Sequence, residues 1–232
     1  MSTATPNVEK IHVPSHEKTF TLLQAIAVIL VSAMVFVGTG FVVGKAFFWK
    51  TLEDTRLDQQ LAFFKAKVEA EPKIAESRVN LGYTYYLKGE YKQALQHLKI
   101  ATQIDPKYAD AFYNIGLVYR EQKSYDEALE SFSKAAKLAP RDYKHFLQMG
   151  VIYNAQGKHK DAITALNRAN EEKPGSADVI YQIGVAAEKT GDKDGARELY
   201  TTAVNYDPNY KEAKEALARL GGPKNPEKQP EH

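Results

Sequence analysis

Small, apolar and polar positions recur along this chain with a fixed period of 34 residues. When the sequence is shifted by 34, the residues of several columns coincide without any insertion: Gly82, Gly116, Gly150 and Gly184; Ala94, Ala128, Ala162 and Ala196; Ala101, Ala135, Ala169 and Ala203; Pro106, Pro140, Pro174 and Pro208. A sustained period of this length is typical of proteins built from stacked supersecondary units. The sequence therefore predicts four copies of one unit.

Within each unit the apolar positions have the spacing of helices rather than of strands. In the second copy they predict one helix from about Ala111 to Gln122 and another over residues 125–138, which Pro140 ends because it has no N–H to donate. Glycine inside the first helix costs roughly 1 kcal/mol relative to alanine. We expect Gly116 to be tolerated because it lets the two helices cross closely, with large neighbours such as Phe132 filling the space beside it.

The segments on either side of the repeats also look helical. Residues 211–220 have an apolar face and a charged face, as expected of a helix that caps a solenoid, and residues 221–232 read as a disordered tail. Residues 51–74 predict a juxtamembrane helix that doubles as a degenerate half repeat, with Phe64 in the position of the large residue.

The first third of the chain contains a long apolar segment. Thr19 to Gly44 carries no charge over 26 residues, which as a helix would be ~39 Å long, against ~30 Å of bilayer hydrocarbon. Phe47, Phe48 and Trp49 follow it, as expected near lipid headgroups. We therefore predict a polar tail over residues 1–18 and a transmembrane anchor over residues 19–50; a cleaved signal peptide or a buried core helix fits the length less well.

Orientation and association of this anchor are less determined. Lysines flank both ends, so the charge bias across the segment is small and by itself leans slightly towards a cytoplasmic repeat domain. Short-tailed anchors of this kind usually export the domain on their carboxy-terminal side, which favours the extracytoplasmic side of a bacterial inner membrane. Gly40 and Gly44 form a GxxxG motif that predicts a helix–helix contact in the membrane, including a possible homodimer, unless the glycines are incidental.

Composition removes several classes of function. The 232-residue chain has a formal charge of +2, which gives no reason to expect nucleic-acid binding, and it has no cysteine for a disulfide, a thiolate metal site or a nucleophile. Of its six histidines, the three within the repeats, His97, His145 and His159, share no repeat position, and no HExxH, GxSxG or phosphate-binding loop is present. We predict no catalytic residues, no cofactor and no metal.

The aligned glycine, tyrosine, alanine, large residue, alanine and proline resemble the tetratricopeptide repeat. The four copies are residues 75–108, 109–142, 143–176 and 177–210, with glycine at position 8, alanine at 20 and 27, and proline at 32. Three residues depart from the family pattern: Arg78 and Ile180 replace an aromatic residue at position 4, and Ala187 replaces the tyrosine in the fourth copy. The resemblance implies an all-α fold, a right-handed solenoid of helical hairpins after the single transmembrane helix.

The resemblance also implies a concave groove that holds an extended peptide. Its predicted residues are those at positions 5, 6 and 9: Val79, Tyr113, Leu147 and Tyr181; Asn80, Asn114, Gln148 and Gln182; Tyr83, Leu117, Val151 and Val185. The amides of position 6 could pair with the main chain of a partner, since a carboxamide both donates and accepts hydrogen bonds. The alternative is that this column is plain solvated surface and that some of the tyrosines pack between repeats.

One subset of the family clamps the terminal carboxylate of heat-shock chaperones. Of the residues that such a clamp requires, this chain keeps only Asn114 and Lys144, and two of its three cations are missing. Without those charge-assisted hydrogen bonds a dianionic terminus would be poorly held. We therefore do not expect that partner class.

Two functions fit these features. The first is a membrane-tethered protein–protein interaction module, a scaffold or assembly factor, that holds an extended segment of a client or neighbouring subunit near the bilayer. The second is a permanent structural subunit of a larger membrane complex, bound through its transmembrane helix and convex face. An enzyme is the least expected, because no catalytic constellation is present.

Overall fold

A computed structural model describes residues 52–223, which form ten α-helices and no strand. The helices are α2 (Leu52–Ala70), α3 (Ala75–Leu87), α4 (Tyr91–Ile104), α5 (Ala109–Glu121), α6 (Tyr125–Leu138), α7 (Tyr143–Ala155), α8 (His159–Glu172), α9 (Ala177–Lys189), α10 (Lys193–Tyr206) and α11 (Lys211–Arg219). The all-α fold expected from the sequence is confirmed for this part of the chain.

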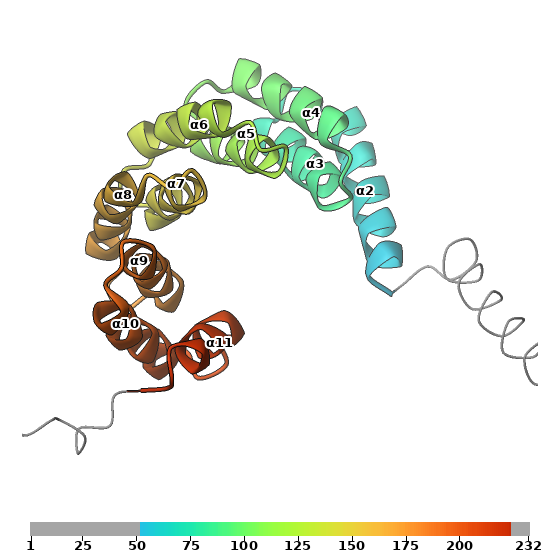
Figure 1. The fold of residues 1–232 in the computed structure, drawn as a ribbon. Helices are drawn as coiled ribbons and strands as arrows, with labels where there is room; N and C mark the ends of the chain where they lie inside the picture. The colour runs from blue at the N-terminus through green and yellow to red at the C-terminus, as the bar shows by residue number, and fades with distance from the viewer. Residues whose placement is uncertain (1–51, 224–232) are drawn as a thin grey trace, which may run out of the picture. The chain divides into compact units, whose positions relative to one another are not determined.

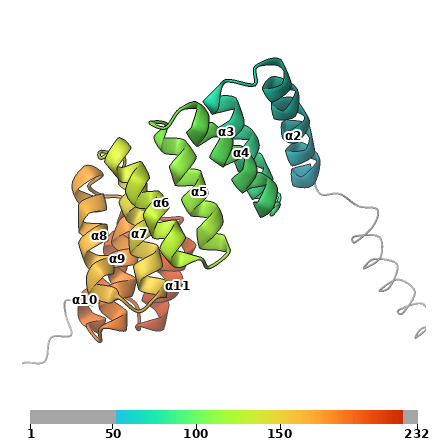
Figure 2. The ribbon, with the colours of Figure 1, turned by 90° about the horizontal axis from the view of Figure 1, so that it is seen from above.

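The helices from α3 to α10 form four antiparallel pairs that stack in chain order (Figure 1, Figure 2). The first helix of each pair, α3, α5, α7 or α9, lies on the inner side of an arc, and the second, α4, α6, α8 or α10, lies on the outer side (Figure 1). One pair falls within each predicted repeat. In the second repeat, α6 has the predicted bounds, whereas α5 begins at Ala109, two residues earlier than predicted.

Glycine at the crossing of each pair is explained by its neighbours. A Cβ atom added to Gly116 would lie 2.7 Å from Cε1 of Phe132, and Phe132 is completely buried. The same holds for three further pairs, each with a distance below 3.0 Å to the large residue of the second helix: Gly82 with Leu98, Gly150 with Leu166, and Gly184 with Tyr200. The predicted reason for tolerating these glycines is confirmed.

Helix α2 extends the solenoid before the first repeat. Val68 is buried in the same core cluster as α3 and α4, and Phe64 packs against that cluster. The Lys88 Nζ atom donates to Asp58 Oδ1 over 2.5 Å, which joins the turn after α3 to α2. The contact between α2 and α3 is nevertheless less extensive than the contact between α4 and α5, the second helix of the first repeat and the first helix of the second repeat. It therefore resembles a second helix of a repeat that is packed more loosely.

Helix α11 covers the other end of the stack. Ala213, Ala216 and Leu217 are buried against the last pair. Arg219 Nη2 donates to Glu188 Oε2 over 2.8 Å, and Tyr200 Oη donates to the same oxygen over 2.7 Å. The last repeat is thus closed by apolar packing and by a charged network, as expected of a capping helix.

Several predicted segments lie outside the described residues. They are the polar tail (1–18), the transmembrane anchor (19–50) with Gly40 and Gly44, and most of the carboxy-terminal tail (224–232). Between residues 52 and 223, no helix combines the length and apolar character that crossing a bilayer requires.

One buried histidine makes stability dependent on pH. His145 is 1% exposed, packs against the Tyr113 ring, and neither of its ring nitrogens has a hydrogen-bond partner. Burial lowers its pKa, and nearby Lys144 lowers it further, although Asp142 and Asp110 oppose this. As the pH is lowered, the histidine of the unfolded chain becomes protonated before the buried histidine of the folded chain. The free energy of unfolding should therefore fall as the pH drops below about 6.5, the usual pKa of histidine, and should be fully retained above it.

Urea unfolding followed by circular dichroism between pH 5 and pH 7.5 would test this expectation on the full chain in a neutral detergent. The variant to compare with the unmodified chain is His145→Val, because valine, as Val179, occupies the same position in the fourth repeat. We expect this variant to lose part of the acid sensitivity; the remainder comes from His97, whose pKa is also lowered. An unchanged pH slope in the variant would contradict the assignment.

Candidate functional site

The predicted groove residues all lie on the inner helices α3, α5, α7 and α9 (Figure 1). Their exposure differs widely. Tyr83 is 40% exposed, whereas four are buried, namely Val79, Asn114, Leu117 and Leu147; the others are half-buried. The buried members support the helix packing, so only part of the predicted set is accessible to a partner.

Six of the twelve predicted residues line one pocket between the first and second repeats. They are Val79, Asn80, Tyr83, Tyr113, Asn114 and Leu117. The pocket is completed by four residues that were not predicted as groove residues: Tyr108, Asp110, Asp142 and Lys144. Position 2 of the repeat, which holds Asp110 and Lys144, could have revealed two of these, while Tyr108 and Asp142 come from turns between repeats.

The pocket combines aromatic rings with opposed charges. Burial raises the pKa of Tyr113 to about 12, so its phenol remains neutral and can act as a hydrogen-bond donor at physiological pH. The Asp142 carboxylate accepts from the Lys144 backbone N–H over 3.0 Å and caps α7. With Asp110, the pocket holds two carboxylates and one ammonium group.

The amide column at position 6 is partly engaged within the chain. Asn114 Nδ2 donates to the Asp110 carbonyl over 2.8 Å. Arg120 Nη1 donates to Gln148 Oε1, and Asn154 Nδ2 donates to the Gln182 carbonyl over 3.0 Å and to Gln182 Oε1 over 3.3 Å. The two glutamines therefore link neighbouring repeats, and their amide N–H groups are not used in these bonds.

The predicted residues of the third and fourth repeats do not join this pocket. Tyr181 packs against Tyr200 and Tyr210, with ring centroids 5.5 and 5.1 Å apart. These contacts lie within the fourth repeat. Packing between repeats, the alternative that the sequence left open for the tyrosines, holds for Tyr113, whose ring centroid lies 5.4 Å from that of His145 in the third repeat. Whether Leu147, Val151, Gln182 and Val185 contact a partner stays a prediction.

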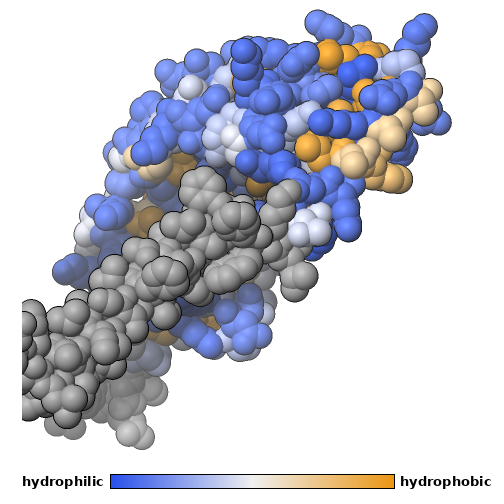
Figure 3. All heavy atoms as spheres, turned by 90° about the vertical axis from the view of Figure 1, so that its right-hand side faces the viewer, coloured by the Kyte–Doolittle hydropathy of each residue, from blue (hydrophilic) through white to orange (hydrophobic). Residues whose placement is uncertain are grey.

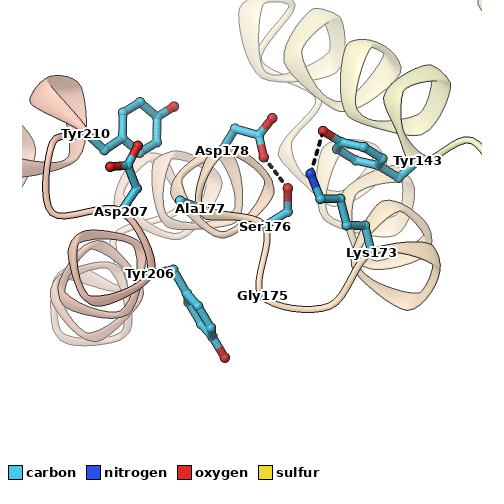
Figure 4. Close-up of a pocket in the computed structure, with 9 residues that line it drawn as sticks. All are labelled: Tyr143, Lys173, Gly175, Ser176, Ala177, Asp178, Tyr206, Asp207 and Tyr210. Carbon is cyan, nitrogen blue, oxygen red and sulfur yellow. Dashed lines mark hydrogen bonds between the residues drawn. The ribbon is translucent and has the colours of Figure 1, made fainter.

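A second pocket lies near the turn before α9 and the end of α10 (Figure 4). Lys173 and Tyr143 point towards each other, with Nζ 3.1 Å from the tyrosine hydroxyl, and Tyr206 is 61% exposed. None of its lining residues was predicted for the groove. Its polar groups bond to one another, as Ser176 does with Asp178, so we do not assign it a ligand.

The surface seen from the side of α2 is mainly hydrophilic, with smaller apolar areas between the polar side chains (Figure 3). Phe63 on α2 is the most exposed large apolar side chain of the described residues, at 63%. Apolar side chains that stand singly on a surface are common in folded proteins and do not by themselves mark an interface. We therefore assign no binding role to this face from its hydropathy.

Solved structures resemble this arrangement. One is "Crystal structure of MamA", with 25% identity and a TM-score of 0.59 over 72% of this chain and 99% of that chain. Another is YrrB, described as "a TPR protein with an unusual peptide-binding site", with 23% identity and a TM-score of 0.57 over 84% and 96%. A third is TTC0263, described as a thermophilic TPR protein in Thermus thermophilus, with 22% identity and a TM-score of 0.61 over 72% and 91%. No match was found among curated proteins.

Family models match most of the repeat region. A TPR repeat model covers residues 82–123, and two models described as tetratricopeptide repeat cover residues 109–142 and 153–220. Together they cover more than half of the chain and lie between α3 and α11, and the match over 109–142 contains one helical pair, α5 and α6. The chain therefore belongs to the tetratricopeptide repeat family.

Proposed function

We propose that this chain is a non-catalytic interaction module that holds an extended segment of a client or neighbouring subunit against its inner helices, near a membrane. The observation that carries the proposal is the pocket between the first and second repeats, where six predicted groove residues converge. The fold is shared with YrrB, a protein described as having a peptide-binding site, which supports a peptide ligand.

The chemistry of this pocket suits main-chain recognition. Asn80 is half-buried and presents an amide that can pair with a peptide backbone, while Tyr83 offers an exposed ring. Tyr83 and Tyr86 stack with ring centroids 5.8 Å apart, which holds the Tyr83 ring in place before a partner arrives. A preformed aromatic contact of this kind loses little conformational freedom on binding.

Membrane attachment completes the proposal. The apolar segment at residues 19–50 would anchor the chain in a bilayer as a single-pass protein, contacting lipid directly, and a repeat domain on the extracytoplasmic side of a bacterial inner membrane is favoured. Gly40 and Gly44 would then provide a helix–helix contact, with a neighbouring subunit or a second copy. These features rest on the sequence alone.

Site-specific photocrosslinking in native membranes would test the groove. A photoreactive phenylalanine analogue at Tyr83 should attach to a partner, whereas the same analogue at Tyr206, which is more exposed but outside the groove, should not. Adding Asn80→Ala should reduce the yield at position 83 by about tenfold, the effect of losing roughly 1.4 kcal/mol of binding energy. Equal crosslinking at both tyrosines would contradict the groove.

The same crosslinking experiment also tests the second hypothesis, in which the chain is a permanent subunit that is bound through surfaces other than the groove. An analogue at Phe63 on α2, which is 63% exposed, samples the surface of α2. Crosslinks that form at position 63 and not at position 83 would favour that hypothesis over a groove-bound client. Asn80→Ala would leave such crosslinks unchanged.

A further inference from the structure

The first repeat has an arginine where the other repeats have a large apolar residue. Arg78 occupies position 4, which holds Phe112, Phe146 and Ile180 in the later repeats. Its Nε atom is buried and has no hydrogen-bond partner, and its Nη1 atom lies 3.3 Å from Nδ1 of His97. An arginine whose donors are so poorly satisfied by the protein is available for an external acceptor.

A histidine and a lysine side chain line the same pocket. The His97 ring stacks on the Tyr85 ring, with centroids 5.4 Å apart and an interplanar angle of 4°. Lys65 on α2 places its Nζ atom 5.6 Å from the centroid of the same tyrosine ring. His97 also departs from its column, where the later repeats have Ser131, Ala165 and Leu199. The unusual residues of the first repeat therefore converge on Tyr85.

These side chains line a pocket between α2, α3 and α4, which shares no residue with the groove pocket. The pocket exists where α2 packs loosely, and α3 contributes Arg78 instead of an apolar side chain that would fill the space. Glu69 is the one acidic residue among those that line it, against Lys65, Arg78 and His97. Its charge is therefore positive even when the imidazole is neutral.

The electrostatics at the histidine agree with this composition. Burial lowers the pKa of His97, and the positive charges of Arg78 and Lys65 lower it further. The titratable groups that line the pocket with the imidazole are Arg78 and Tyr85 from α3, with Lys65 and Glu69 from α2. The folded chain thus holds a concentration of positive charge that an anion would relieve.

We propose that the pocket between α2, α3 and α4 binds a phosphate group, held by Arg78, Lys65 and His97. A guanidinium pairs with phosphate through charge-assisted hydrogen bonds, and the two positive charges of Arg78 and Lys65 suit an anion that can carry two charges better than a single carboxylate. His97, whose Nδ1 faces Arg78, adds an imidazole N–H donor. The phosphate can belong to a soluble phosphate or to a lipid headgroup. The second source is relevant because α2 begins at Leu52, directly after the predicted membrane segment.

NMR of the histidine side chains in the full chain, solubilised in a neutral detergent, would test the site. Titration with inorganic phosphate, at ionic strength held constant with chloride, should raise the pKa of His97 in a saturable manner and leave the ring resonances of His159, which lies outside the pocket, unchanged. Arg78→Leu should weaken phosphate binding by at least about tenfold, since it removes the main charge-assisted donor. This variant restores the apolar character of the column and should fold.

The controls separate the site from general charge effects. Arg141→Leu removes an exposed arginine outside the pocket and should leave phosphate binding unchanged, whereas Lys65→Gln should weaken it. Reconstitution into phosphatidylcholine vesicles with or without phosphatidylglycerol distinguishes the two sources of phosphate. If the pKa of His97 rises only when phosphatidylglycerol is present, and if Arg78→Leu abolishes this rise, the ligand is a lipid headgroup. If neither phosphate nor phosphatidylglycerol changes His97, or if Arg78→Leu has no effect, the proposal is wrong.

Discussion

Replacing Phe132 with alanine is expected to lower the free energy of unfolding by about 3–5 kcal/mol, the usual cost of removing a fully buried aromatic ring. Phe132 is 0% exposed and lies at the centre of the cluster formed by α5, α6 and α7, where it contacts Tyr113 with ring centroids 5.5 Å apart. Because it fills the space beside Gly116, which has no side chain to move into the gap, the cavity cannot readily collapse.

The measurement is urea unfolding of the full chain in neutral detergent, followed by circular dichroism in the far ultraviolet. The control is Phe63→Ala, which removes the same ring from a position that is 63% exposed and should change stability by less than about 0.5 kcal/mol. If the two variants lost similar stability, the packing described at the crossing of α5 and α6 would be incorrect.

Replacing Gly150 with valine should also destabilise the fold, by about 1–3 kcal/mol, although valine is a better helix former than glycine. A Cβ atom at Gly150 would lie 2.5 Å from Cγ and 2.6 Å from Cδ2 of Leu166. Leu166 is 0% exposed, so it has no open space into which it can move. The steric conflict between α7 and α8 therefore outweighs the gain in helix propensity.

A double-mutant cycle isolates this conflict. Leu166→Ala alone should cost about 2–5 kcal/mol because it leaves a cavity. In the Leu166→Ala background, Gly150→Val should cost about 1 kcal/mol less than it does alone, since the new side chain then enters vacant space. Strict additivity of the two changes would mean that Gly150 and Leu166 do not meet as described.

The sequence predicted the repeat fold well because the fold depends on a few residues that recur in every unit. The recurring glycines and alanines mark where the two helices of a repeat cross, and the recurring prolines mark where the second helix ends. Because these residues recur in four copies, they define the four helical pairs. The start of α5 was less well predicted. Ala109 and Asp110 belong to the helix without contributing to the apolar pattern that was used to find it.

The groove was predicted less completely, for a physical reason. Whether an amide of position 6 faces a partner or a neighbouring repeat depends on how far each pair is rotated relative to the next. That rotation brings Arg120 to Gln148 and Asn154 to Gln182, which a one-dimensional alignment does not show. The pocket residues Tyr108 and Asp142 come from turns and were missed because only helix positions were considered.

The bridges from Arg120 to Gln148 and from Asn154 to Gln182 bear on how the arc can deform. Both join position 12 of one repeat to position 6 of the next, whereas in the described part of the chain the corresponding residues of the first junction, Tyr86 and Asn114, share no hydrogen bond. Bending that widens the arc would therefore break polar links at the second and third junctions but not at the first. The junction beside the aromatic pocket instead joins α3 to α5 through apolar packing, with Val79, Ile115 and Val118 in one core cluster, so its contact surface contains no polar link of this kind that a partner would have to break.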